Sequence, residues 1–145
     1  MLKKLLIPIA AMALLGACDF GPAPATPAPP VAPSPTVSYM LFFDWDSAKL
    51  TDKAMATVNE AAGIYKERGA TRVAVTGYTD TTGSADYNTQ LSLRRGNAVK
   101  DALMKGGVPA TAITVTSSGE MGLLVPTAQD VRDERNRRVQ IVITK

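Results

Sequence analysis

The sequence predicts an α/β sandwich, in which a mixed four-stranded sheet carries two helices on one face. Two observations support this fold class. Segments in which apolar and β-branched residues alternate, typical of strands, are interleaved with segments whose apolar residues recur at helical spacing. The order along the chain is β-α-β-α-β-loop-β. Because crossovers in β-α-β units are right-handed, both helices should cover the same face of the sheet.

Composition and spacing indicate the first strand and the first helix. Residues 37–43 are apolar and aromatic, which favours a strand. Thr51 and Asp52 are typical of a helix start, because they offer an N-cap side chain and an acid in the first turn. An apolar face follows at spacings of three and four, and Gly69 is expected to end the helix. The residues of this face are Met55, Val58, Ala62 and Tyr65.

The rest of the chain predicts three more strands and a long helix. Residues 72–78 are expected to form a buried strand, and residues 85–105 the helix. Residues 113–117 alternate as a third strand. Residues 119–134 combine turn residues with charges and should form a loop. Val139, Ile141 and Ile143 alternate as the last strand, and the helix should present Leu91, Ala98, Val99, Ala102 and Leu103 to the sheet.

Residues 1–17 are typical of a lipoprotein signal peptide. Lys3 and Lys4 precede an apolar run over residues 5–15, shorter than the roughly 20 residues that span a bilayer. The run ends in Leu-Gly-Ala-Cys, which resembles the bacterial lipobox, so Cys18 is expected to carry the lipid. Cys18 is also the only cysteine, which leaves no partner for an intramolecular disulfide. The alternative is an ordinary signal peptide with an incidental cysteine.

Residues 18–36 comprise the expected lipidated cysteine and a linker rich in proline and alanine. Such a composition cannot build a core and favours extended polyproline II. At about 3.1 Å per residue, the linker would reach on the order of 50 Å. A spacer between an anchor and the globular domain, residues 37–145, is therefore expected. A ligand for a partner domain is the alternative, although no PxxP motif stands beside a basic residue.

Charge and composition exclude several functions. The net charge of the chain is +3, and 14 basic and 12 acidic residues follow Thr36. A nearly neutral domain of this kind does not suit nucleic-acid binding. The chain has no histidine, which excludes a Ser-His-Asp triad, a Cys-His pair and histidine-ligated zinc. We therefore expect a protein that is not an enzyme and needs no metal or cofactor.

One enzymatic alternative stays open, a muramidase that uses two carboxylates. Such a pair would combine Asp44 or Asp46 with Asp80 or Glu120.

The central motif is the stretch from Gly77 to Gly83, Gly-Tyr-Thr-Asp-Thr-Thr-Gly. It places the carboxylate of Asp80 at the end of a predicted strand and leads into a helix whose first N–H groups are free. Arg94 and Arg95 follow in that helix. A carboxylate, a guanidinium and a helix N-terminus around one concavity could hold a zwitterion. Spacing alone also fits an ordinary turn and a solvated helix face.

Together with further short motifs, this stretch resembles the signature of the OmpA C-terminal domain family. The motifs are Phe-Phe-Asp-Trp-Asp-Ser at 42–47, Tyr-Asn at 87–88, Leu-Ser at 91–92, Arg-Arg at 94–95 and Asn-Arg-Arg-Val at 136–139. They occur in the order of the family and cover about residues 37–145. The resemblance, closest to peptidoglycan-associated lipoproteins, implies non-covalent binding of peptidoglycan through the diaminopimelate of its stem peptide.

The resemblance also implies the residues of the site. Asp80 would take the ammonium of diaminopimelate, and Arg95 its carboxylate, because Gly96 stands where the family has a small residue after the arginine. It places an arginine of the Asn-Arg-Arg run near the site; Arg138 is the candidate named here, and Arg137 stays open. The remaining candidates are Asp44, Thr79, Asn88 and Leu91.

The function implied is that of a lipid-anchored, non-catalytic protein that ties a membrane to the cell wall. The expected location is the periplasmic face of the outer membrane. Asp19 resembles a signal for retention in the inner membrane, so that location stays open. The alternative function is an envelope adaptor of the Tol-Pal type with weak wall binding, in which residues 119–134 contact a periplasmic Tol-type protein.

Overall fold

The computed structural model describes residues 36–145. The predicted signal peptide, the lipidated Cys18, Asp19 and all of the linker but its last residue lie outside the described residues. Within the described part of the chain, no helix is both long and apolar enough to cross a membrane.

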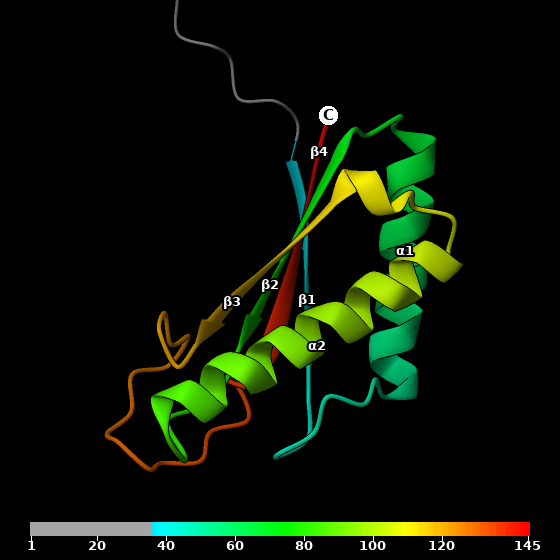
Figure 1. The fold of residues 1–145 in the computed structure, drawn as a ribbon. Helices are drawn as coiled ribbons and strands as arrows, with labels where there is room; N and C mark the ends of the chain where they lie inside the picture. The colour runs from blue at the N-terminus through cyan, green and yellow to red at the C-terminus, as the bar shows by residue number, and fades with distance from the viewer. Residues whose placement is uncertain (1–35) are drawn as a thin grey trace, which may run out of the picture. The chain divides into compact units, whose positions relative to one another are not determined.

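A four-stranded mixed sheet forms the centre of the domain, with the strands in the order β1-β4-β2-β3 (Figure 1). β4 is antiparallel to both of its neighbours, whereas β2 and β3 run parallel. Because β1 and β2 end where β4 begins, three strand termini meet at one edge of the sheet. The strands are β1 (Thr36–Phe42), β2 (Arg72–Tyr78), β3 (Ile113–Gly119) and β4 (Arg138–Thr144).

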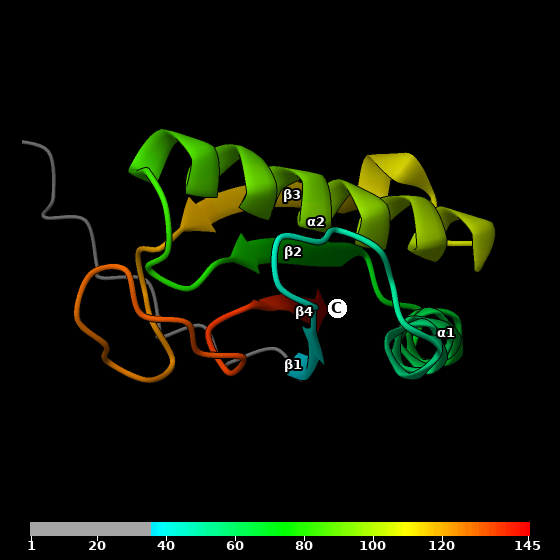
Figure 2. The same cartoon turned by 90° about the horizontal axis from the view of Figure 1, so that it is seen from below.

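Both helices pack on the same face of this sheet, which confirms the predicted fold class. α2 (Ala85–Lys105) lies along β2 and β3, and α1 (Asp52–Glu67) lies beside α2 and against β1 (Figure 2). A short 3-10 turn, η1 (Ala110–Ala112), precedes β3 and was not predicted. The other face of the sheet carries no helix in the described residues.

The predicted start and end of α1 are confirmed, but its buried face differs from the prediction. Thr51 caps the helix through a 3.2 Å bond from the Ala54 amide, and Gly69 follows it with a φ of +56°. Met55 is 38% exposed and Tyr65 only half-buried. The side chains that face the core are mostly small, because these let the helix approach the sheet closely: Ala54, Val58, Ala61 and Ala62.

Two glycines bring α2 close to the sheet. A Cβ at Gly77 in β2 would lie 2.0 Å from the carbonyl oxygen of Ser92, so the two backbones are in direct contact. A Cβ at Gly96 would lie 2.6 Å from Cγ1 of Val115 in β3. The predicted face of α2 is buried except at Ala98, which is only partly covered. This close approach places Arg95 beside the end of β2.

Candidate ligand-binding site

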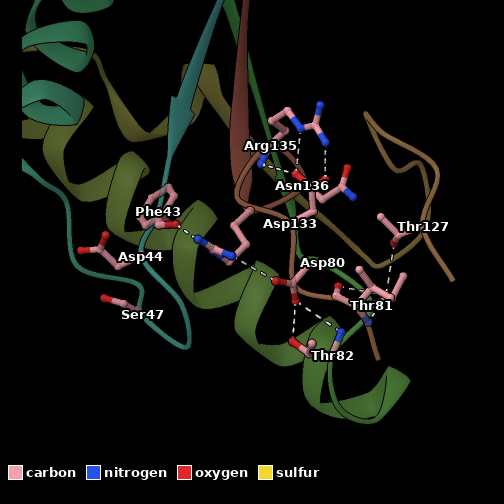
Figure 3. Close-up of polar contacts among 12 residues, drawn as sticks. Phe43, Asp44, Ser47, Asp80, Thr81, Thr82, Thr127, Asp133, Arg135 and Asn136 are labelled. Carbon is pink, nitrogen blue, oxygen red and sulfur yellow. Dashed lines mark hydrogen bonds and ion pairs between the residues drawn. The ribbon is translucent and has the colours of Figure 1, made fainter. Parts of the chain in front are cut away.

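A small cavity of about 160 Å³ opens at the edge of the sheet where β1 and β2 end and β4 begins. Four segments that are distant in sequence line it: the β1–α1 loop, the β2–α2 loop, the first turns of α2, and the residue before β4. Figure 3 shows Asp80 beside α2, with Asp44 and Ser47 of the β1–α1 loop approaching from another side. The lining residues are Trp45, Asp46, Asp80, Thr82, Gly83, Tyr87, Asn88, Leu91, Arg95 and Arg137.

Asp80 is 3% exposed and is held from two directions. Its Oδ1 accepts bonds from the Thr82 hydroxyl at 2.5 Å and the Thr82 amide at 3.3 Å (Figure 3). Its Oδ2 accepts from Nη1 of Arg137 at 3.3 Å. A carboxylate offers about four acceptor positions. Asp80 therefore keeps capacity for a further donor, such as an ammonium in the cavity.

Arg95 is 0% exposed and ties the walls of the cavity together. Its Nε, Nη1 and Nη2 donate to the carbonyl oxygens of Ser47, Tyr78 and Asp44 at 2.8, 3.0 and 3.0 Å. A guanidinium has five N–H donors, so about two stay available to a ligand. Burial, reinforced by the nearby charge of Arg137, lowers the pKa of Arg95 to about 10. The side chain is still a cation at neutral pH.

Of the two candidate arginines before and in β4, the structure places Arg137 at the cavity, not Arg138. Arg137 bonds Asp80 and also donates from Nε to the Phe43 carbonyl at 3.1 Å. Arg138 points to the sheet face opposite the helices, because side chains alternate along β4 and its neighbour Val139 faces the core. There it stacks on the Tyr78 ring at 3.8 Å and donates to the Gly122 carbonyl.

The other predicted residues divide into two groups. Asn88 and Leu91 line the cavity from α2, and Nδ2 of Asn88 donates to Glu120 at 3.0 Å. Asp44 and Thr79 do not line it. Asp44 takes part through its backbone carbonyl, which accepts from Arg95, while Thr79 is buried and its hydroxyl has no partner among the described residues.

Trp45, Asp46 and Tyr87 line the cavity but were not predicted as binding residues. Asp46 adopts a φ of +50°, a left-handed conformation that aspartate tolerates better than most residues. This turn directs its carboxylate to the hydroxyl of Tyr87, which donates a hydrogen bond to it. The chain's only tryptophan directly before Asp46 was the available sequence signal.

The chain between β3 and β4, residues 120–137, is fixed against the cavity wall by polar contacts. The Thr81 hydroxyl donates to the Ala128 carbonyl at 2.6 Å, and Figure 3 shows it directed toward Thr127. The Asn136 side chain bonds both the amide and the carbonyl of Val125. These contacts explain how a segment without helix or strand still holds Arg137 beside Asp80.

The geometry suits a ligand end that carries both charges. The Asp80 carboxylate and the guanidiniums of Arg95 and Arg137 meet in one cavity, so an ammonium and a carboxylate could bind side by side. The carboxylates considered for glycan cleavage already accept hydrogen bonds, Asp46 from Tyr87, Asp80 from Thr82 and Glu120 from Asn88. No cluster of potential metal ligands occurs in residues 36–145.

The model of the OmpA family matches residues 42–137. The chain therefore belongs to the OmpA family, and the family resemblance seen in the motifs is confirmed.

Three relatives illustrate the match. Over 77% of its length, the chain is 42% identical to an outer membrane protein of Gluconacetobacter diazotrophicus, of which it spans 31%. It is 31% identical over 71% of its length to the peptidoglycan-associated lipoprotein of Legionella pneumophila, spanning 58% of that protein. The solved peptidoglycan-associated lipoprotein of Burkholderia pseudomallei covers 72% of the chain, with 89% of its own chain, at a TM-score of 0.67 and 27% identity. The chain thus spans less than two thirds of these two curated relatives.

Proposed function

We propose that this chain is a lipid-anchored, non-catalytic peptidoglycan-binding protein that ties the envelope membrane to the cell wall. The observation that carries the proposal is the cavity in which Asp80 lies with Arg95 and Arg137. The names of two relatives, both peptidoglycan-associated lipoproteins, support the same ligand.

The proposed ligand group is the free end of diaminopimelate in the stem peptide, which bears an ammonium and a carboxylate on one carbon. The ammonium would bind Asp80, and the carboxylate the free N–H groups of Arg95 and Arg137. Leu91 would contact the methylenes, and Asn88 retains an amide oxygen that can accept from the ammonium. At about 160 Å³ the cavity is well below the roughly 300–1,000 Å³ of pockets for larger ligands. A single amino-acid end suits this size.

Asp80→Asn is the variant that tests this site. It preserves the shape of the side chain but removes the charge that would bind the ammonium. We expect a loss of about 2 kcal/mol or more, equivalent to about 30-fold in affinity. The measurement is a pull-down of the detergent-solubilised chain on insoluble peptidoglycan of the diaminopimelate type, with circular dichroism to verify that the variant folds.

Asp133→Asn is the matched control, because Asp133 also pairs with an arginine, Arg135, but lies outside the cavity. It should bind like the wild type. Free diaminopimelate should compete for binding, whereas lysine, which lacks the second carboxylate, should not. Equal retention of the wild type and Asp80→Asn on peptidoglycan would refute the site.

The anchor in this proposal is Cys18, with the Pro/Ala-rich linker spanning the distance to the wall. The outer membrane is the proposed location, supported by the name of the Gluconacetobacter relative. Cys18→Ser should move the chain from the membrane fraction to the soluble periplasmic fraction after cell disruption, because a serine cannot carry the thioether-linked lipid. A variant that stays in the membrane fraction would contradict lipidation at this residue.

A second candidate function is an envelope adaptor that contacts a periplasmic Tol-type protein. The exposed apolar side chains of Met121, Leu124 and Val131 in the β3–β4 loop favour a protein contact there. Peptidoglycan binding that survives Asp80→Asn, together with capture of a purified Tol-type protein through this loop, would favour the adaptor.

A further inference from the structure

Two exposed aromatic side chains flank the mouth of the cavity, and each supports an arginine. Trp45 is 51% exposed and carries the guanidinium of Arg132 at 3.9 Å from its ring centre. Tyr87 is 43% exposed and carries that of Arg94 at 5.6 Å. The hydrogen bond from the Tyr87 hydroxyl to Asp46 connects the two sides. We call Arg94 and Arg132 the rim arginines.

The charges within the cavity are balanced without the rim arginines. Two carboxylates, Asp46 and Asp80, and two guanidiniums, Arg95 and Arg137, line it. Neither Arg94 nor Arg132 forms an ion pair with an acid of residues 36–145. An arginine stacked on an aromatic ring uses its face and leaves its N–H edge free to bind an anion. The mouth therefore presents two cations that the described acids do not neutralise through ion pairs.

We infer that the rim arginines, Arg132 above all, bind a carboxylate that the ligand carries next to its diaminopimelate. In a stem peptide, the glutamate linked through its side chain to diaminopimelate has such a free α-carboxylate. This inference rests on the proposed function, because it requires the diaminopimelate end to occupy the cavity. It adds selectivity: a stem peptide whose glutamate is amidated to isoglutamine would lose the contact.

The test is a calorimetric titration of the full-length chain in detergent with three soluble probes. These are L-alanyl-γ-D-glutamyl-meso-diaminopimelate, its isoglutamine form, and free meso-diaminopimelate. We expect wild type to bind the acid tripeptide about threefold to fivefold more tightly than the amidated one, in line with a solvent-exposed ion pair. Arg132→Gln should abolish this preference and leave the affinity for free diaminopimelate unchanged.

Arg72→Gln is the matched control, because Arg72 is an exposed arginine at the opposite end of β2 from Asp80. It should keep the preference, and Arg132→Lys should keep part of it. Equal affinity of wild type for the acid and amidated tripeptides, or a preference that Arg132→Gln retains, would overturn the inference while leaving the cavity assignment intact. If free diaminopimelate and both tripeptides fail to bind wild type, the proposed function falls and this inference with it.

Discussion

Replacing Gly77 with alanine is expected to lower the free energy of unfolding by about 3 kcal/mol or more, or to prevent folding. The added Cβ would lie 2.0 Å from the backbone oxygen of Ser92 and 2.8 Å from its carbonyl carbon. Because these atoms belong to a helix backbone, no side-chain rotation can relieve the overlap. α2 must move away from β2, and the Asp80 loop between them moves with it.

Gly63→Ala is the control with the opposite sign. Gly63 lies inside α1, and a Cβ there meets nothing within 4 Å. Alanine should therefore stabilise the helix by about 0.5–1 kcal/mol. Urea denaturation followed by circular dichroism at 222 nm measures both variants. Equal midpoints for the two alanine variants would show that α2 does not depend on the close contact at Gly77.

Arg95→Met is expected to cost about 3 kcal/mol of stability, because it leaves three backbone carbonyls without their donors. These carbonyls belong to Asp44, Ser47 and Tyr78, so the variant also releases the β1–α1 loop from the end of β2. Arg95→Lys should retain most of this loss, because a single ammonium cannot reproduce the planar fork of donors. Peptidoglycan binding should be lost in both variants.

Arg94→Met provides the comparison for stability. Arg94 is the adjacent residue of the same helix, but its side chain is exposed and contacts only the ring of Tyr87 in the structure. Its unfolding midpoint should stay within about 0.5 kcal/mol of wild type. An Arg95→Met variant as stable as Arg94→Met would show that the three carbonyls find other partners, such as water.

These two predictions affect how binding experiments are interpreted. Loss of binding in an Arg95 variant reports the collapse of a cavity wall together with any lost ligand contact. Asp80→Asn is the cleaner test, because the change is isosteric and the carboxamide oxygen can still accept from Thr82. The structure therefore favours Asp80 over Arg95 as the residue for testing the ligand.

Much of the fold could be predicted because its signals are local. Thr51 caps α1, Gly69 follows it in a left-handed conformation, and the alternating residues of β4 are buried at every second position. Each of these features depends on a few neighbouring residues, whose backbone geometry fixes the periodicity. The buried face of α1 was predicted less well, because the choice between Met55 and Ala61 depends on how closely the sheet approaches.

The sequence by itself determined the order of elements, the family, and the placement of Asp80 at the end of a strand. The tertiary structure decided which side chains meet there. It selected Arg137 over Arg138, committed Arg95 to the carbonyls of two loops, and brought Trp45 and Tyr87 to the mouth. The physical reason is that the cavity forms between segments up to 57 residues apart, as in the Asp80–Arg137 pair. Local patterns specify each segment, whereas only the packing of α2 against the sheet sets the distances between them.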